Sequence, residues 1–177
     1  QPLKGQPRGI FFNKVKNIII KNISVFNTVL EGIRIDCSYP NTTSKNILIE
    51  KCRIERRGFT LPDIMFRSIT DDPFNSTNVQ PQISKGIVRN NITIGGNHGI
   101  AIFNSKYISV TGNRCIANTH RGIIISPGGE DILISKNKVD SAGSTGIHLA
   151  FNVKNIRIEN NYVSNTVADM SGLGQEG

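Results

Sequence analysis

The sequence predicts an all-β solenoid, a right-handed single-stranded parallel β-helix of about six to seven rungs. A short apolar motif returns along nearly the whole chain of 177 residues, which contains 28 isoleucines and 20 asparagines. Isoleucine is a strand former, whereas asparagine is a turn residue that tolerates a positive φ. A chain rich in both residues favours many short strands separated by many tight turns.

The first repeated element is a strand that opens with glycine and isoleucine. It occurs at residues 9–12, 32–35, 99–102, 122–125 and 146–149, with residues 57–61 as a degenerate member. The glycines are 23, 26, 41, 23 and 24 residues apart, so the period is near 24 and the long interval contains an insertion. Apolar residues alternate with variable ones in each copy, which predicts that one face of each strand is buried.

A second strand follows the first in every period, and a corner and a third short strand follow the second. The second strand is found at residues 16–22, 45–49, 106–110, 130–134 and 154–160. The corner after it is occupied by Asn113, Asn137 and Asn161, with Asn91 expected to join them. Stacked asparagine side chains can hydrogen-bond along a column and satisfy backbone groups at the corners. Three strands in a period, short corners and an asparagine column predict the parallel β-helix.

One segment does not follow the repeat. Residues 62–82 are expected to form a loop insertion on one side of a single domain that spans residues 1–177. The chain is expected to be a fragment of a longer one. Phe12, Phe103 and Phe151 follow the first strand in three rungs and are expected to stack inside. The three cysteines lack zinc-site spacing and are expected to be buried thiols.

With these motifs the sequence resembles the right-handed β-helix superfamily that contains pectate lyases, polygalacturonases and phage tailspikes. The resemblance covers about residues 8–165 and rests on scaffold positions. It implies that a substrate lies along the sheet made by one strand of every rung, which here is the glycine–isoleucine strand.

The residue before each glycine gives the candidate catalytic group. Successive rungs place Glu31, Arg57, His98, Arg121 and Thr145 there, and neighbouring rungs are about 5 Å apart. Two flanking arginines should lower the pKa of His98 and keep its imidazole neutral. We therefore expect His98 to act as a general base, with Arg57 and Arg121 neutralising an anionic intermediate. This combination suits β-elimination from a uronate.

Further contacts are expected on the outward face of the same strands. The outward row predicted from the alternation is Phe11, Arg34, Thr60, Ala101, Ile124 and His148. Its apolar middle argues against a catalytic centre on the strand around Ala101 and Ile124. Substrate-binding residues are therefore expected at Arg34, Asp36, His148 and Glu31, and His120 is a weaker candidate.

Carboxylates could also hold a cation above this groove. Asp36, Asp63, Asp71 and Asp72 are near it in the predicted arrangement, and Ca²⁺ prefers several oxygen ligands. The resemblance to pectate lyases implies such a Ca²⁺ bridge to an acidic sugar. No Ca²⁺-loop spacing accompanies these residues, so no metal is assigned and Ca²⁺ is left open.

The net charge of +8 points to an anionic partner. Lysine and arginine are spread through all rungs and no nucleic-acid motif is present, so an acidic polysaccharide is expected instead of DNA or RNA. The absence of an 18-residue apolar run argues against a membrane span. The expected location is extracellular or at the cell surface, including a virion, and a homotrimer is left open.

Two function classes remain at this point. The first is a polysaccharide-processing enzyme, either a lyase or a glycoside hydrolase, that acts on an acidic glycan. The alternative is a non-catalytic structural or carbohydrate-binding β-helix, such as a phage appendage or an adhesin. The insertion and the charged edge favour the enzyme, whereas the apolar outward row and the lack of tryptophan favour the alternative.

Overall fold

The computed structural model describes residues 8–37, 43–56, 61–68 and 82–167. These segments form eighteen short β-strands. None of the described residues belongs to a helix that is long and apolar enough to cross a membrane.

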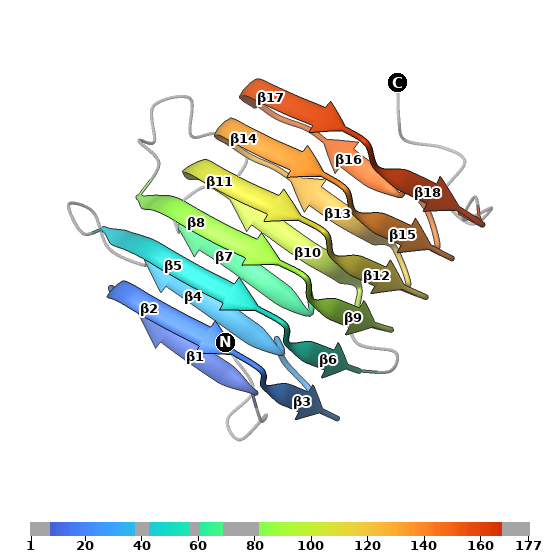
Figure 1. The fold of residues 1–177 in the computed structure, drawn as a ribbon, viewed down its shortest axis with the longest axis horizontal. Coiled ribbons are helices and arrows are strands. Elements are labelled where there is room, and N and C mark those ends of the chain that lie inside the picture. The colour runs from blue at the N-terminus through green and yellow to red at the C-terminus, as the bar shows by residue number, and fades with distance from the viewer. Residues whose placement is uncertain (1–7, 38–42, 57–60, 69–81, 168–177) are drawn as a thin grey trace.

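The strands make three parallel sheets that run along the length of the molecule (Figure 1). Sheet A consists of β1 (Ile10–Asn13), β4 (Ile33–Cys37), β7 (Ile64–Ser68), β10 (His98–Phe103), β13 (Arg121–Ile125) and β16 (Ile147–Leu149). Sheet B consists of β2 (Lys16–Lys21), β5 (Ser44–Glu50), β8 (Ile83–Arg89), β11 (Ser105–Thr111), β14 (Glu130–Ser135) and β17 (Lys154–Glu159). Sheet C consists of β3 (Ser24–Phe26), β6 (Arg53–Glu55), β9 (Ile92–Ile94), β12 (Arg114–Ile116), β15 (Lys138–Asp140) and β18 (Tyr162–Ser164).

Each rung contributes one strand to each sheet, so six rungs stack in chain order from β1 to β18 (Figure 1). The register between rungs aligns equivalent residues. Ile100 lies opposite Ile64 on one side and Ile123 on the other. The predicted parallel β-helix is therefore confirmed, and the six described rungs agree with the predicted number.

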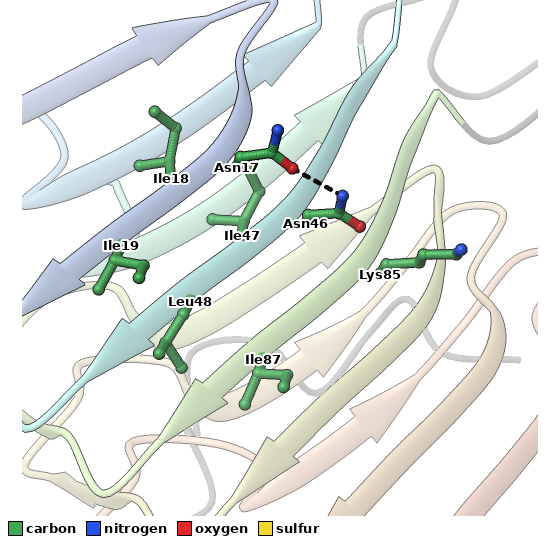
Figure 2. A pocket seen from close by; sticks show the side chains of 8 residues that line it. All are labelled: Asn17, Ile18, Ile19, Asn46, Ile47, Leu48, Lys85 and Ile87. Atoms are coloured by element: carbon green, nitrogen blue, oxygen red, sulfur yellow. Dashed lines mark hydrogen bonds between the residues drawn. The ribbon is translucent and has the colours of Figure 1, made fainter.

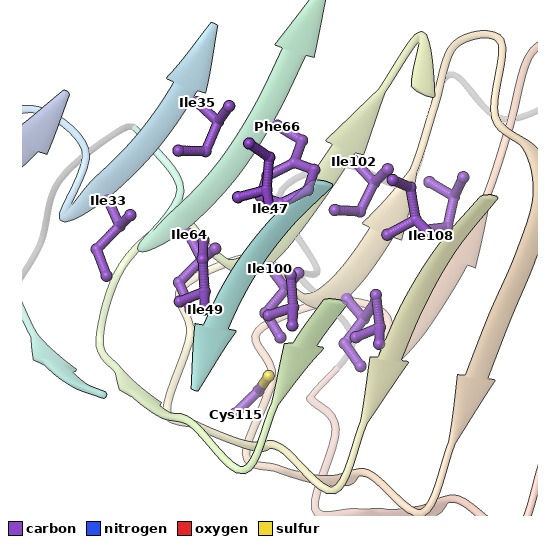
Figure 3. Packing of buried hydrophobic residues seen from close by; sticks show 14 of the residues in the cluster. Ile33, Ile35, Ile47, Ile49, Ile64, Phe66, Ile100, Ile102, Ile108 and Cys115 are labelled. Atoms are coloured by element: carbon purple, nitrogen blue, oxygen red, sulfur yellow. The ribbon is translucent and has the colours of Figure 1, made fainter. Parts of the chain in front are cut away.

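The core is a set of aliphatic columns that run along the solenoid axis (Figure 3). Two columns come from sheet A: one contains Ile33, Ile64, Ile100 and Ile123, and the next contains Ile35, Phe66, Ile102 and Ile125. Burial of such side chains drives folding, at about 25 cal/mol for each Å² of apolar surface. Cys37, Cys52 and Cys115 are buried in the same core, as expected.

The predicted asparagine column is present at the corner between sheets B and C. Asn91, Asn113 and Asn137 each donate through Nδ2 to the Oδ1 of the next asparagine, at 2.9, 3.0 and 2.9 Å, ending at Asn161. Each Nδ2 also donates to a carbonyl in the preceding rung; for Asn113 this is the carbonyl of Val88, at 2.9 Å. The column satisfies corner groups that would otherwise be buried without partners.

Left-handed backbone conformations form columns of their own and explain the asparagine-rich composition. In every sheet B strand the residue after the register position of Lys16 has a positive φ, between 51° and 58°; these residues are Asn17, Asn46, Lys85, Tyr107, Asp131 and Asn155. A second such column follows sheet B, at Asn22, Lys51, Asn90, Gly112, Lys136 and Asn160. Asparagine adopts this conformation more readily than other non-glycine residues.

The prediction of a loop over residues 62–82 is wrong in its first part. Ile64–Ser68 is a regular strand of sheet A that pairs with β4 and β10. Its alternation of buried Ile64 and Phe66 is regular, but Asp63 occupies the place that glycine takes in the other rungs. Consequently Met65, not Thr60, occupies the outward row. Residues 57–60 and 69–81 lie outside the described residues.

The repeated glycine is required by a close approach between sheets A and C. A Cβ atom on Gly122 would collide with Cγ1 of Val139, and one on Gly99 would lie 2.6 Å from Oγ1 of Thr93. A side chain at Gly99 or Gly122 would therefore displace the sheet C residue that fills the interior next to it.

The expected interior stack of phenylalanines is wrong. Phe12 packs against the core, but Phe103 packs on the outer face of sheet A and Phe151 is 61% exposed. Phe103 aligns with Arg67, one position beyond the last inward residue of its strand, so the strand alternation turns its ring outward.

Candidate functional site

The edge where the sheet A strands begin brings the principal predicted residues together. His98 and Arg121 are register partners in adjacent rungs. The backbone N–H of Gly9 donates to the carbonyl of Glu31, and that of Asp63 donates to the carbonyl of His98 in the same way. The column at this edge is therefore Arg8, Glu31, Pro62, His98, Arg121 and Thr145.

Arg57 was predicted to precede His98 in this column, but the register gives that place to Pro62. The reason is that Asp63, and not Gly58 as predicted, occupies the glycine position of the third rung, so the residue before it is Pro62. Arg57 itself lies outside the described residues, so its expected contact with His98 stays a prediction.

His98 is a largely buried imidazole with an unusually low proton affinity. Burial lowers its pKa to about 3, with further contributions from the charges of Arg121, His120 and His148. Its Nδ1 is buried and has no hydrogen-bond partner in the described part of the chain. His98 is therefore neutral at pH 7, the protonation state that its predicted role needs.

His120, which the sequence indicates as a weaker candidate, completes the cluster. Its ring stacks on that of His98 with centroids 5.4 Å apart and planes inclined by 29°. Nη1 of Arg121 lies 3.3 Å from its Nδ1, so the guanidinium can donate to the ring. His120 lies in the turn before β13, outside the repeated motifs, and only its place directly before Arg121 could have indicated it. We refer to His98, His120 and Arg121 as the histidine edge.

A second charged group lies at the opposite end of sheet A. Nη1 of Arg34 contacts Oε1 of Glu31 at 2.7 Å, and Nη2 contacts Oδ2 of Asp36 at 2.6 Å. All three side chains are buried, and Arg8 adds a contact to Glu31 at 3.2 Å. Burial raises the pKa of Glu31, but the Arg34 charge and the hydrogen bonds of Glu31 outweigh this effect and hold the pKa below its usual value.

This acidic–basic group contains three of the four predicted substrate-binding residues. Arg34 is only 7% exposed and is committed to its two carboxylate partners. A substrate contact by Arg34, Asp36 or Glu31 would therefore have to replace an ion pair that is already made. These roles stay predictions.

The middle of the outward row is filled by apolar side chains. Met65, Ala101 and Ile124 are buried and pack with Phe103. His148 aligns with Ile124 and is half-buried next to this group. It interacts electrostatically with His98, so the structure brings His148 near the histidine edge. The apolar middle that the sequence indicated is present, with Met65 as an added member.

Asp63 does not lie above a groove, contrary to the expectation. Its carboxylate is fully buried inside the corner, where Gly96 N and Asn118 Nδ2 each donate to Oδ2 at 3.3 Å. Nη1 of Arg56 lies 3.8 Å from Oδ1, and this buried guanidinium also donates to four backbone carbonyls. Burial raises the pKa of Asp63 well above its usual value.

The remaining cation candidates give no shared site. Asp36 is paired with Arg34 on the outer face, Asp63 is paired with Arg56 inside, and residues 71 and 72 lie outside the described residues. Nowhere in the described ranges do three or more His, Cys, Asp or Glu side chains form a group that could hold a metal ion.

Three parallel sheets, six stacked rungs and an internal asparagine column define a right-handed parallel β-helix protein with a charged edge on one sheet. Comparison with protein families identifies the particular family. A model described as "Periplasmic copper-binding protein (NosD)" matches residues 2–172, nearly the whole chain, and the protein belongs to this family. Comparisons with curated proteins and with solved structures found no match.

The family description names copper, so we tested whether the described residues fit this metal. Copper takes imidazole, thiolate and thioether ligands. The closest histidine pair, His98 and His120, has the positive charge of Arg121 beside it. Burial raises the pKa of the Cys115 thiol to about 12, which keeps it protonated, and Met65 packs among apolar side chains. These residues do not fit a copper site.

Proposed function

We propose that the protein binds an acidic polysaccharide at sheet A and cleaves it at the histidine edge. The observation that carries this proposal is the neutral, largely buried imidazole of His98, whose register partner Arg121 lies in the next rung and whose pKa the Arg121 charge helps to lower. A neutral imidazole can accept the proton from C5 of a uronate, and the nearby cation can stabilise the anion that remains. This anion then forms the C4–C5 double bond and breaks the bond from C4 to the glycosidic oxygen, which takes a proton from the imidazolium or from water.

The low pKa of His98 is part of the proposal. A base with a pKa of about 3 is weak at neutral pH, because a catalytic pKa works best near the operating pH. The carboxylate of a bound uronate would oppose the charge of Arg121 and raise the pKa of His98. His98 would then be a stronger base with the anionic substrate in place than without it, although burial, the largest cause of its low pKa, would still act.

The family description also bears on location. We infer that the chain works in the periplasm, outside the cytoplasm, in keeping with the expected extracellular or cell-surface location. An acidic glycan is the expected partner there. Trimerisation and Ca²⁺ dependence stay proposals that the same preparation can test by light scattering and by chelation.

A non-catalytic, carbohydrate-binding β-helix is the second candidate, and one observation favours it. The centre of the outer face of sheet A is occupied by Met65, Ala101 and Ile124, so a glycan chain could cross that face only above buried apolar side chains. Such a protein would bind an acidic glycan at the histidine edge without changing it.

The test is incubation with pectate, alginate, glucuronan and a capsular polysaccharide, with and without Ca²⁺. The absorbance of unsaturated uronate and new reducing ends are both followed. We expect both signals with the wild type, loss of both in His98→Ala and in Arg121→Gln, and full activity in the matched control Arg157→Gln, whose side chain is largely exposed on sheet B.

The other outcomes separate the candidates. Reducing ends without unsaturated uronate would indicate hydrolysis and would contradict the elimination. Binding without either product, lost in Arg121→Gln, would replace the enzyme with the non-catalytic candidate. A folded protein that neither binds nor cleaves any of these polymers would contradict both.

A further inference from the structure

The outer face of sheet B carries a shallow hollow of about 470 Å³ across the first three rungs (Figure 2). Its floor contains Ile19, Leu48 and Ile87, which follow one another in register. Ile19 is 71% and Ile87 is 40% exposed, so the floor is open to solvent. Adjoining exposed apolar side chains of this kind mark interaction sites.

Polar groups line one side of this floor. Asn17, Asn46 and Lys85 occupy the left-handed column two positions before the floor residues, and Nδ2 of Asn46 donates to Oδ1 of Asn17 at 2.8 Å. Figure 2 shows the two amides side by side and the Lys85 amine pointing away from the strands. These amides and this amine can bind hydroxyl and carboxylate groups.

The residues directly before Asn17, Asn46, Lys85 and their equivalents form a lysine-rich row parallel to the solenoid axis. The register aligns Lys16, Lys45, Ser84, Lys106, Glu130 and Lys154. We call this row the cationic stripe; four of its six residues are lysines. Lys16, Lys45 and the neighbouring Lys85 have no ion-pair partner within the part of the chain described.

We infer that this face of sheet B is a second binding surface, which takes a linear, carboxylate-bearing polysaccharide lying along the solenoid axis. Its carboxylates would meet the cationic stripe and Lys85, its hydroxyls the two amides, and the C–H faces of its sugar rings the aliphatic floor. Rungs are about 4.8 Å apart, a repeat similar to the length of one sugar unit in an extended glycan. The stripe offers a lysine in the first, second, fourth and sixth rungs, and Lys85 lies beside Ser84 in the third.

Two other occupants fit less well. A second copy of the chain would bring the stripe against another positively charged surface, and like charges across an interface oppose association. Single-stranded nucleic acid would need aromatic or arginine side chains for base stacking, and the hollow has an aliphatic floor with lysine and asparagine beside it.

This inference goes beyond the proposed function, because it concerns a different sheet and stands whether or not the protein cleaves the polymer. The histidine edge is on sheet A, and none of its residues lines the hollow. Variants of the two surfaces therefore separate the two proposals.

The test is titration calorimetry of the full chain with a size-defined oligogalacturonate, and with a neutral maltooligosaccharide of equal length, at two salt concentrations. The key variant is Lys45→Gln with Lys85→Gln. Its matched control is Lys138→Gln with Lys136→Gln, which also removes one strand lysine and one exposed lysine of positive φ. We expect Kd to rise roughly tenfold in the key variant and less than about twofold in the control.

A floor variant tests the apolar contact. Ile19→Thr with Ile87→Thr keeps β-branched side chains on exposed positions, so the fold is retained and Kd should rise by a similar factor. His98→Gln should leave these effects in place even if it abolishes cleavage.

Several results would overturn the inference. These are equal weakening in the key variant and its control, equal affinity for the neutral oligosaccharide, and absence of binding by a folded protein. Tighter binding of oligothymidylate at matched salt would assign the stripe to nucleic acid. Binding of phosphatidylserine vesicles but not oligogalacturonate would assign it to a membrane surface.

Discussion

The outer faces of sheets A and B share the same six-rung register but differ in how far their outward side chains are exposed. On sheet A the outward row is buried from the second rung to the fifth: Arg34 is paired with two carboxylates, and Met65, Ala101 and Ile124 pack together. On sheet B the equivalent row begins with exposed Ile19 and Ile87, next to lysines without ion-pair partners among the described residues. The core specifies the solenoid, whereas the outward rows are free to specialise.

The largest expected effect is on stability, at Arg34. Arg34→Met leaves Glu31 and Asp36 buried without their partner, which should lower the free energy of unfolding by about 3–5 kcal/mol. Chemical denaturation measures this change. The comparison is Ile19→Thr on sheet B, which should change it by less than about 0.5 kcal/mol because that side chain is mostly exposed. Similar values for the two variants would show that the two faces do not differ as described.

A smaller effect is expected where sheet A begins. Gly122→Ala should cost about 1–3 kcal/mol, because the added methyl group collides with Val139 and lies 2.7 Å from the carbonyl of Gly146. Adding Val139→Ala should recover part of this loss by making room. A double variant that is as unstable as the sum of both single changes would refute the steric explanation.

The pH dependence of stability distinguishes the histidine edge. The pKa of His98 is about 3 in the folded protein and near 6.5 in the unfolded chain. Between these values the unfolded chain binds more protons, so stability is greatest above pH 6.5 and falls as pH drops toward 3. His98→Gln should show a shallower fall between pH 6.5 and 4.5, measured by denaturation at each pH. Parallel curves for the two proteins would mean that His98 protonates freely in the folded state.

The smallest effect is expected at the left-handed column of sheet B. Asn46→Gly removes an exposed hydrogen bond to Asn17 but relieves the positive φ of 57°, so thermal unfolding should show a net change within about 0.5 kcal/mol. Asn46→Val should destabilise clearly, because a β-branched residue is strained in this conformation. If valine were tolerated as well as glycine, the left-handed column would not constrain the sequence.

Most of the fold followed from the sequence, because the same steric demand recurs in every rung. Gly122 lies where a side chain would collide with the next sheet, and Asn113 bonds the next asparagine of the corner column. One residue type suits each position best, so both residue types recur at a regular spacing in the sequence. The sheet A strand of the third rung was not predicted, because two positions of the repeat differ there at once. Asp63 stands in the place of the glycine, and Thr93 stands in the place of the aliphatic residue that the glycine faces in other rungs.

The candidate site was predicted less completely. The low pKa of His98 was predicted from two flanking arginines, of which the register places Arg121 next to His98 and puts Pro62 in the place of Arg57. Burial makes the largest contribution to this low pKa and cannot be seen in a repeat pattern. The pairing of Arg34 with Glu31 and Asp36 was not predicted, because outward direction was taken to mean exposure. The hollow on sheet B depends on which exposed residues remain uncovered, and only three-dimensional packing determines this.

The asparagine column links successive rungs through side-chain hydrogen bonds. The carboxamides of Asn91, Asn113 and Asn137 are oriented the same way, because each donates to the asparagine of the next rung. The relay ends at Asn161, which accepts from Asn137 and donates to backbone carbonyls. Hydrogen bonds in such a relay polarise one another. Each hydrogen bond of the column therefore depends on the bonds before and after it, so the stability of one rung depends on more than its two neighbours. Loss of the amide at Asn113 would weaken amide-exchange protection on both sides of the defect, at Asn91 and at Asn137.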